Sequence, residues 1–391
     1  MRILFTSQPG LGHWHPLIGL ARALQTAGHE VAFATTPGAC AAIEVNGIRC
    51  FPVGRDESDE ALRERRRWLM DRPPAEQAAY MVGEIFAGIT AERALPGMMA
   101  VGRTWQPAVV VRENLEFTGF LMAEALGVPH AVVQVTAWRP PMHQGAVEAL
   151  DRLRPGIGLP SDPDPNTMFR YLLLLPRPPG FVDQATLPAT AHMVQPLIFD
   201  RSGDEQLPAW VDGLPDRPLV YATLGTAFNQ APGVLAAIIG GLRDEPVTLV
   251  LTTGRDLDPA TFGPQPPNVH IERYIPQSLF FPRCDAVVTH GGSGTVMAAL
   301  RYGVPMVIIP IAADQPENAR LCAEMGVGRV IGSPSRTPEA IREAAREVLE
   351  NPKYRANAER VRDDIASLPG LDHTVGLIET LASGKRTPVG V

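Results

Sequence analysis

The sequence has no long hydrophobic run and no excess of positive charge. Its 391 residues carry a formal net charge of −7, so no basic surface is expected to hold nucleic acid or an anionic membrane. The longest apolar stretches, such as residues 304–313, are far shorter than the roughly 18 to 20 residues that cross a bilayer. Pro9 and Gly10 interrupt the first apolar stretch, which argues against a signal peptide. These features predict a cytoplasmic protein that binds neither nucleic acid nor membranes.

Cysteine and histidine are sparse. The first two histidines, His13 and His15, are two residues apart, and the chain has no HExxH pattern or His/Cys cluster. The sequence therefore predicts no metal site. None of the four cysteines is in a CxxC pair, and four are too few for a disulfide scaffold, so we expect reduced thiols. The cysteines are Cys40, Cys50, Cys284 and Cys322.

Strand and helix patterns alternate along two long stretches of the chain. In the first, an apolar strand over 3–7 leads into a Gly-rich turn, and a helix is expected to begin near Pro16 and to end at Gly28. A further strand completes a βαβ unit, and the same pattern recurs near 108–135 and from 218 onwards. It predicts an α/β fold with two Rossmann-like, doubly wound domains that face each other across a cleft, where ligands usually bind.

Proline is dense over 139–217, between the two α/β series. The charged segment 55–95 is expected to be an inserted helix or loop with a solvated face. The predicted division is an N-terminal domain over 1–200, a linker over 201–217, a second domain over 218–372 and a C-terminal segment over 373–391.

The strongest motif is THGGSGT, over residues 289–295. It follows an apolar strand and opens a helix, so that backbone N–H groups and the positive helix end point to one place. The glycines let an anion approach the backbone closely, and His290 can add a donor to a phosphate oxygen. A tight turn that needs glycine only for its dihedral angles is the alternative. The grouping of three glycines with a Ser, a Thr and a His favours a phosphate site.

The turn after the first strand reads GLGHWHP over 10–16. A dinucleotide-binding loop would have a third glycine where His15 stands and an acidic residue after the next strand, so NAD binding is disfavoured. The turn instead brings His13 to the expected mouth of the cleft, where an imidazole can accept a proton near neutral pH. Capping of the helix is the alternative role, and it fits His15 better than His13.

These motifs resemble those of a known family. GxGHxxP near the N-terminus, and HGGxGT followed by GVP and DQ in the second half, are similar to the motifs of nucleotide-sugar-dependent glycosyltransferases of the GT-B type. The resemblance is greatest to actinobacterial antibiotic glycosyltransferases, which glycosylate macrolides, enediynes and aromatic polyketides. It covers the first 35 residues, 107–143 and 218 to about 335. It also implies a C-terminal helix that returns to the first domain.

In this family a histidine acts as the general base on the acceptor hydroxyl, and the resemblance implies that role for His13. The carboxylate that pairs with it would be Glu113, where many relatives have Asp. Such a carboxylate fixes the imidazole tautomer and stabilises the imidazolium. A strand-end salt bridge with Arg112 is the alternative role for Glu113.

The resemblance also implies a donor site in the second half. His290 and the following amides would hold the diphosphate, Tyr274 would stack on the base, and the Ile275 backbone would read the base edge. A buried strand-end tyrosine is the alternative for Tyr274. Asp314 and Gln315 would contact sugar hydroxyls. The implied donor-site residues are Gly225, Thr226, Tyr274, Ile275, His290, Gly292, Ser293, Gly294, Thr295, Asp314 and Gln315.

One departure from the family concerns the donor. Relatives that use UDP-sugars commonly have a Glu on the helix after the glycine loop, where it binds the ribose hydroxyls, and the matching residue here is Ala298. In a dTDP-sugar the nucleotide contains deoxyribose, which has no 2′-hydroxyl, so a carboxylate at this position would be left unpaired. Ala298 therefore favours a dTDP-sugar, a deoxysugar donor, as co-substrate, with no further cofactor.

The acceptor pocket is expected on loops of the first domain, with a largely apolar lining that suits a hydrophobic small molecule. Each of these residues could instead belong to the core. The candidates are Gly12, Trp14, Phe117, Trp138, Met142 and His143.

The sequence thus predicts an inverting glycosyltransferase that moves a sugar from a dTDP-sugar to a hydroxyl of a hydrophobic natural-product aglycone. One alternative is a UDP-sugar-dependent small-molecule glucosyltransferase. Others are a nucleotide-sugar epimerase, a cell-wall GlcNAc transferase, and a nucleotide-sugar-binding partner subunit of another transferase. A homodimer and a need for an activator protein are both compatible with the sequence.

Overall fold

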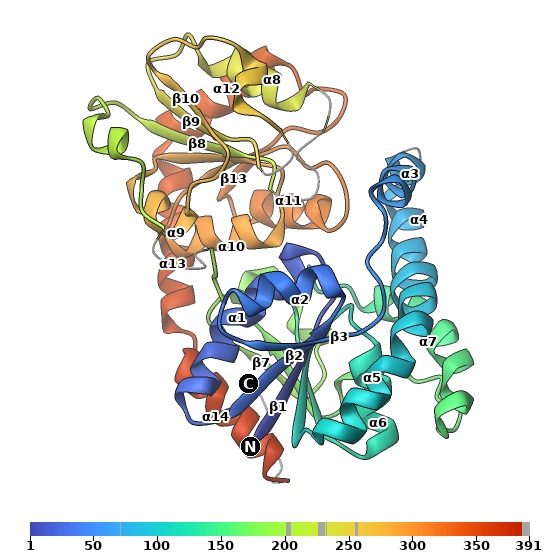
Figure 1. The fold of residues 1–391 in the computed structure, drawn as a ribbon. Coiled ribbons are helices and arrows are strands. Elements are labelled where there is room, and N and C mark those ends of the chain that lie inside the picture. The colour runs from blue at the N-terminus through green and yellow to red at the C-terminus, as the bar shows by residue number, and fades with distance from the viewer. Residues whose placement is uncertain (71, 201–204, 226–230, 232, 255–256, 385–391) are drawn as a thin grey trace. The chain divides into compact units, whose positions relative to one another are not determined.

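The computed structural model describes residues 1–70, 72–200, 205–225, 231, 233–254 and 257–384. These residues form two compact units, which Figure 1 shows in ribbon form. Unit 1 contains Met1–Arg177, Val182–Phe199 and the chain from Leu368, and unit 2 contains Pro178–Phe181 and Asp200–Ser367. Each unit is a parallel β-sheet packed against helices, which confirms the prediction of two Rossmann-like domains.

The sheet of unit 1 has seven parallel strands in the order β3-β2-β1-β4-β5-β6-β7. Strands β4, β5 and β6 are buried along their whole length, as expected for a sheet with helices on both faces. The order reverses direction between β1 and β4, which are adjacent. The strands are β1 (Arg2–Thr6), β2 (Glu30–Thr35), β3 (Arg49–Pro52), β4 (Val109–Glu113), β5 (His130–Val133), β6 (Leu172–Leu175) and β7 (Ala191–Met193).

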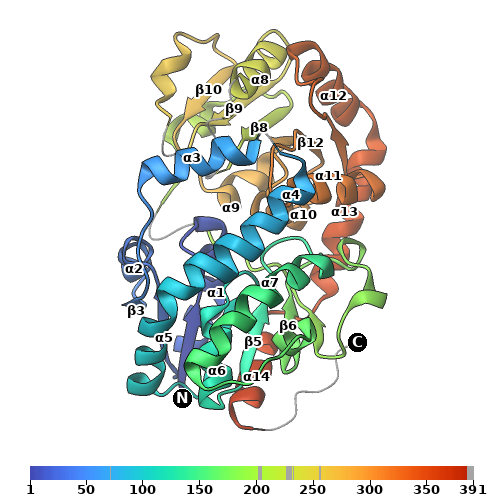
Figure 2. The same cartoon turned by 90° about the vertical axis from the view of Figure 1, so that its right-hand side faces the viewer.

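Successive residues of each strand point to opposite faces of the sheet, and each face has its own core. Ile3 and Phe5 pack under α1, α2 and α14, while Leu4 packs on the other side, under η1, α5, α6 and α7. Figure 2 shows that α4, η1 and α5 form one continuous helical segment. The bounds are α1 (Leu11–Thr26), α2 (Pro37–Glu44), α3 (Asp59–Met70), α4 (Pro74–Ala79), the π-helical η1 (Tyr80–Thr90), α5 (Ala91–Trp105), α6 (Thr118–Leu126), α7 (Pro140–Leu153) and α14 (Leu371–Ala382).

Unit 2 repeats this plan with six parallel strands in the order β10-β9-β8-β11-β12-β13, and its order reverses between β8 and β11. Helices α8 and α12 cover one face of the sheet. The strands are β8 (Leu219–Thr223), β9 (Thr248–Thr252), β10 (Val269–Glu272), β11 (Ala286–Thr289), β12 (Met306–Ile308) and β13 (Gly328–Val330). The helices are α8 (Val234–Leu242), α9 (Gln277–Phe280), α10 (Ser293–Arg301), α11 (Gln315–Glu324), α12 (Pro338–Glu350) and α13 (Pro352–Ser367).

The first helix begins earlier than predicted. We expected it to start near Pro16, but α1 starts at Leu11 and contains Pro16 in its second turn. The reason is that the buried face already begins at Trp14, which lies three and four residues before Leu17 and Ile18. As a consequence, His13 lies in the first helical turn and not in a loop.

The expectation of a solvated segment over 55–95 is wrong for its second half. In η1, Val82 and Ile85 are buried, and the helix packs against α7. These apolar residues are three positions apart and give the segment an inward face that the charges before it obscured.

The expectation of reduced thiols is wrong for one pair. Cys40 of α2 and Cys50 of β3 form a disulfide. Helix α2 packs against β3, which brings these two residues together although ten positions separate them. Cys284 and Cys322 are free and buried, and burial raises the pKa of both thiols. Neither is therefore a thiolate near neutral pH.

The C-terminal helix α14 belongs to unit 1. Gln195 donates to the backbone oxygens of Leu368 and Pro369, and His29 contacts Glu379 of α14 at 2.8 Å. The described part of the predicted linker, residues 205–217, belongs to unit 2. Within it, Trp210 stacks on His270. In the described part of the chain, no helix is long and apolar enough to span a membrane.

Candidate active site

A histidine and a carboxylate meet where the strand order of unit 1 reverses. Because β1 and β4 are neighbours and parallel, the segments that follow them emerge at the same edge of the sheet. The segment after β1 leads into the first turn of α1, which carries His13, and β4 ends with Glu113. Nδ1 of His13 lies 3.1 Å from Oε1 of Glu113. The structure thus brings together the two residues that the sequence predicts as a catalytic pair.

The carboxylate of Glu113 is completely buried and is anchored by the backbone. Its Oε1 accepts a hydrogen bond from the N–H of Gln8 at 3.3 Å, and its Oε2 accepts one from the N–H of Leu115 at 2.7 Å. These amides fix the orientation of the carboxylate. With Nδ1 of His13 directed at Glu113, Nε2 lies on the opposite edge of the ring. The His13 side chain is 22% exposed, so solutes can reach it.

Arg112 does not form the alternative salt bridge. Because neighbouring residues of a strand point to opposite faces, its guanidinium lies away from the Glu113 carboxylate. It donates to the carbonyl oxygens of Glu116 at 3.1 Å and Met168 at 2.8 Å, and more weakly to that of Glu113 at 3.4 Å. Burial lowers the pKa of Arg112 to about 10, opposed by the nearby carboxylates of Glu116, Glu113 and Glu124. The arginine remains a cation at neutral pH.

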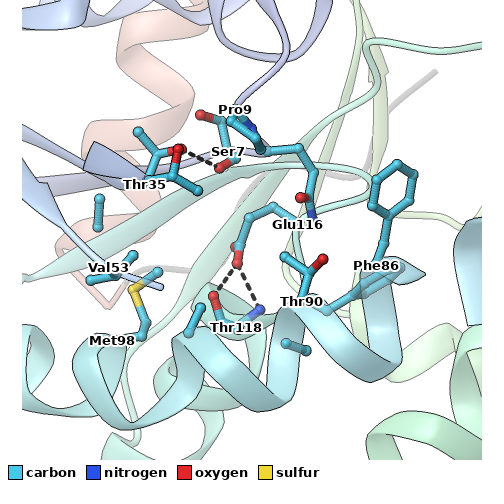
Figure 3. Close-up of a pocket in the computed structure, with 15 residues that line it drawn as sticks. Ser7, Pro9, Thr35, Val53, Phe86, Thr90, Met98, Glu116 and Thr118 are labelled. Carbon is cyan, nitrogen blue, oxygen red and sulfur yellow. Dashed lines mark hydrogen bonds between the residues drawn. The ribbon is translucent and has the colours of Figure 1, made fainter. Parts of the chain in front are cut away.

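A small cavity lies beside this pair, and Figure 3 shows its walls. Phe86 of η1 lines the cavity and also contacts the His13 ring edge-to-face, with centroids 6.0 Å apart. The wall has polar positions such as Ser7 and Thr35 and apolar positions such as Val53. The cavity therefore has both polar and apolar walls next to the His13–Glu113 pair.

Glu116 also lines this cavity, and sequence reasoning missed it. It accepts hydrogen bonds from Thr6 Oγ1 at 2.5 Å, Thr118 N at 2.7 Å and Gly119 N at 2.9 Å. Burial raises the pKa of Glu116, and these hydrogen bonds oppose that effect. The bonds to the first amides of α6 identify it as the anchor of that helix. The only signal in the sequence was a second carboxylate three residues after Glu113.

The residues expected to line an acceptor pocket do not gather in one place. Phe117 lines the cavity of Figure 3, whereas Trp14 is 3% exposed and packs in the core. Trp138 is half-buried and donates to Thr186. Gly12 is an exposed position of α1 with open space around its Cα. Met142 lies in α7, but its side chain is outside the part of the chain that the structure describes.

His143 is buried between Trp138 and Phe169. Neither ring nitrogen has a hydrogen-bond partner among the described residues. Burial, together with a smaller contribution from the positive charge of Arg112, lowers the pKa of His143 to about 3. The imidazole is thus a neutral core residue at physiological pH.

The donor loop of unit 2, which we define as residues 289–295, occupies the matching position in the second sheet. It follows β11, and Gly225 follows the adjacent strand β8. Gly225 has a φ of +68°, and a Cβ there would lie 2.6 Å from Cε1 of His290. A Cβ on Gly292 would lie 2.5 Å from Nε2 of His290. The two glycines therefore enclose the imidazole, and no larger residue fits at either position without moving it.

The electrostatics of the donor loop suit an anion. Burial lowers the pKa of His290 to about 4, although the carboxylate of Asp314 opposes this. His290 is therefore a neutral hydrogen-bond donor near pH 7. The first backbone hydrogen bond of α10 runs from Val296 N to Gly292 O, so the amides of Ser293, Gly294 and Thr295 precede the hydrogen-bonded helix. Such amides at a helix N-terminus are a general anion-binding arrangement.

The other predicted donor residues surround this loop or lie near it in the chain. Ser293 donates to Oδ2 of Asp314 at 2.6 Å. The Gln315 side-chain oxygen accepts from the amides of Ile311 and Ala312, which leaves its NH2 group as its donor. Tyr274 is 54% exposed and donates its hydroxyl proton to the backbone of Asp200, so it is not the buried tyrosine of the alternative interpretation.

Two further donor positions need separate mention. The Ile275 side chain is buried, which leaves its backbone as the part that can contact a ligand. Thr226 lies outside the residues that the structure describes. In the described part of the chain, no three His, Cys, Asp or Glu side chains gather as a metal site requires.

The contact of His290 with two glycines gives a test of the donor loop. In Gly292→Ala the added methyl group must displace the His290 ring, which should lower the free energy of unfolding by about 1 to 3 kcal/mol. In a His290→Ala background the same change should cost little, because the ring is gone. Gly294→Ala is the matched control, since nothing lies within 4 Å of a Cβ there. Equal destabilisation by Gly292→Ala in both backgrounds, measured by denaturant unfolding, would contradict this packing.

The buried histidines also predict how stability depends on pH. The pKa of His143 falls to about 3 and that of His130 to about 4, from 6.5 in the unfolded chain, mainly through burial. Because the unfolded chain binds these protons first, stability is complete above pH 6.5 and is lost as the pH falls towards 4. Each group should account for a loss of about 2 kcal/mol by pH 5.

His143→Leu should remove its share of this loss. We expect the difference in unfolding free energy between pH 7 and pH 5 to shrink by about 2 kcal/mol in this variant. His373, an exposed residue of α14, provides the control variant His373→Leu, which should leave the difference unchanged. Urea denaturation at the two pH values measures both, and an unaltered pH dependence in His143→Leu would show that this histidine is not buried as described.

Comparisons with known proteins agree with this arrangement. The erythromycin biosynthesis protein CIII-like family matches with its N-terminal domain over residues 22–139 and with its C-terminal domain over 247–381. Among similar proteins, the L-demethylnoviosyl transferase of Streptomyces niveus is 30% identical, over 94% of this chain and 95% of that relative. The 3-alpha-mycarosylerythronolide B desosaminyl transferase of Saccharopolyspora erythraea is 28% identical, over 99% of this chain and the whole relative.

The fold is also similar to that of a solved structure. The crystal structure of glycosyltransferase VinC in complex with dTDP has a TM-score of 0.82 and 28% identity to this chain, and the match covers 98% of this chain and 100% of VinC. Two Rossmann-like units, a histidine–carboxylate pair and a glycine-rich loop at a helix N-terminus are thus present in a chain that matches both domains of one family. The chain belongs to the antibiotic glycosyltransferases of the GT-B type.

Proposed function

We propose that this glycosyltransferase moves a deoxysugar from a dTDP-sugar to a hydroxyl of a hydrophobic natural-product aglycone, with inversion at the anomeric carbon. The observation that carries the proposal is the 3.1 Å contact between His13 and Glu113. Glu113 is held by two backbone amides, so its carboxylate is oriented before any substrate binds. A preorganised histidine–carboxylate pair is the arrangement that general-base catalysis requires.

In the proposed reaction, His13 removes the proton of the acceptor hydroxyl. Glu113 keeps the ring proton on Nδ1, so Nε2 presents its lone pair and accepts the acceptor's proton. The acceptor oxygen then attacks the anomeric carbon from the face opposite the diphosphate, and the bond to the diphosphate oxygen breaks. The carboxylate stabilises the imidazolium that results. A positioned base of this kind contributes roughly 100- to 10,000-fold to the rate.

The donor loop would stabilise the leaving diphosphate. Its amides at Ser293, Gly294 and Thr295 and the neutral imidazole of His290 are preorganised donors at a positive helix end. The diphosphate gains negative charge as its bond to the sugar breaks, so these donors act most strongly in the transition state.

Three observations support a thymidine nucleotide and a deoxysugar. Ala298 lies on α10 and offers no carboxylate to a ribose 2′-hydroxyl. VinC, which is similar over nearly its whole length, was crystallised with dTDP. The relative from Saccharopolyspora erythraea is named as a desosaminyl transferase.

The acceptor would bind on unit 1, beside Phe86 and His13. This proposal revises the predicted acceptor residues, because Trp14 packs in the core and His143 is enclosed by aromatic rings. Phe86 is half-buried and lies against the His13 ring, so it can offer an apolar contact to a hydrophobic acceptor. A partner subunit without activity, one of the alternatives from the sequence, would have no need of the His13–Glu113 pair.

His13→Ala tests this function. Loss of the general base should lower kcat/KM by about 100- to 10,000-fold, and the affinity for dTDP should stay within about twofold, because the donor loop is in the other unit. Glu113→Gln should give a smaller loss, since the base remains but its tautomer is no longer fixed. His15→Ala is the matched control on the same helix, because its ring packs against Trp14 and Phe199 and not against Glu113. Full transfer activity in His13→Ala, or loss of dTDP binding, would contradict the proposed mechanism.

A further inference from the structure

Asn318 connects two parts of the proposed donor site that the sequence treats as separate. It lies in the first turn of α11 and is completely buried. Its Nδ2 is 2.9 Å from the carbonyl oxygen of Gly291, 3.1 Å from Oγ of Ser293 and 3.2 Å from Oδ2 of Asp314. Two of these acceptors belong to the donor loop, and the third is the carboxylate implied in sugar recognition.

The carboxylate of Asp314 is turned towards the donor loop. Asp314 stands at the N-cap position of α11, where an aspartate normally accepts from the first amides of its own helix. It makes no such side-chain capping bond. Its Oδ2 accepts instead from Ser293 and Asn318, at 2.6 Å and 3.2 Å. The side chain therefore does not stabilise its own helix in the usual way, and these two residues hold it towards the loop.

The backbone before Asp314 is held in a costly conformation. Ala313 has a φ of +58°, in the left-handed region that residues other than glycine rarely adopt. The side chain of Gln315 secures this turn by accepting from the amides of Ile311 and Ala312. Strained backbone of this kind persists where the surrounding contacts determine it, and it occurs preferentially at ligand sites.

We propose that Asn318 is a positioning residue that fixes the Asp314 carboxylate relative to the donor loop and so determines how tightly the sugar of the donor is held. The proposal rests on the proposed function, in which the donor loop binds the diphosphate and Asp314 contacts the sugar. An amide has two N–H groups, so Nδ2 shares them among three oxygens and holds all three at one point. Without this amide, the Asp314 carboxylate and the Gly291 carbonyl would lose their common donor.

If Asn318 only filled space in unit 2, its removal would have a different effect on ligand affinity. Its loss would weaken the whole donor site, so affinities for the bare nucleotide and the sugar nucleotide would fall together. A positioning residue for Asp314 should change the two affinities unequally, because only the sugar nucleotide uses that carboxylate. The ratio of the two affinities therefore separates the two roles.

The test is a double-mutant cycle with Asn318→Ala and Asp314→Ala, with dTDP and dTDP-glucose titrated by calorimetry. We expect each single variant to weaken dTDP-glucose about tenfold and dTDP less than threefold. The double variant should be no weaker for dTDP-glucose than Asp314→Ala alone, because Asn318 acts through Asp314. Additive losses, or equal losses for both ligands in Asn318→Ala, would overturn the proposal.

Further outcomes keep the test decisive. If wild-type protein binds neither ligand, the proposed donor site fails and this inference fails with it. If the ligands bind but Asp314→Ala leaves the affinity ratio unchanged, the donor site stands, and only the role of Asp314, and with it this inference, is overturned. If Asn318→Ala does not fold, Asn318→Asp replaces the donor amide by an isosteric carboxylate beside Asp314. That variant should also lose affinity for dTDP-glucose more than for dTDP, and it should recover part of this loss in an Asp314→Asn background. A wild-type affinity ratio in Asn318→Asp would overturn the positioning role.

Discussion

The candidate site in each unit depends on the reversal of strand order within a parallel sheet. Where β1 and β4 are adjacent, two chain segments that are about a hundred residues apart emerge at the same sheet edge, and this brings His13 to Glu113. The same arrangement at β8 and β11 brings Gly225 to His290. Strand pairing in a fully buried sheet leaves little freedom for these segments, so the functional side chains are positioned by the register of the core.

Burial gives these side chains their chemical character. Glu113 is buried but accepts two backbone hydrogen bonds, and it can therefore hold a histidine tautomer. Burial lowers the pKa of His290 to about 4 although the carboxylate of Asp314 opposes this, so the ring remains a neutral donor. The two glycines that enclose its ring allow this burial, because any Cβ at either position would meet the imidazole. Burial is thus accompanied by an anchored carboxylate in one unit and by a neutral imidazole in the other.

The sequence predicted the features that depend on local pattern and motif. These include the two α/β units, the donor loop, and the residues His13 and Glu113, which the structure brings together. The earlier start of α1 was available from the spacing of Trp14, Leu17 and Ile18, but Pro16 obscured it. The Cys40–Cys50 disulfide depends on how α2 packs against β3, and Asn318 depends on which oxygens surround its amide. No pattern in the chain encodes these tertiary contacts.

We propose that unit 2 holds a thymidine diphosphate at a glycine-rich helix end, where Ala298 provides no carboxylate to bind a ribose. The most direct measurement is calorimetric titration of the purified protein with dTDP and, separately, with UDP. We predict that dTDP binds at least about tenfold more tightly, which corresponds to about 1.4 kcal/mol. Equal or tighter binding of UDP would contradict the inference that Ala298 favours a thymidine nucleotide, but the protein would still be a glycosyltransferase. Binding of neither nucleotide would contradict the donor site itself.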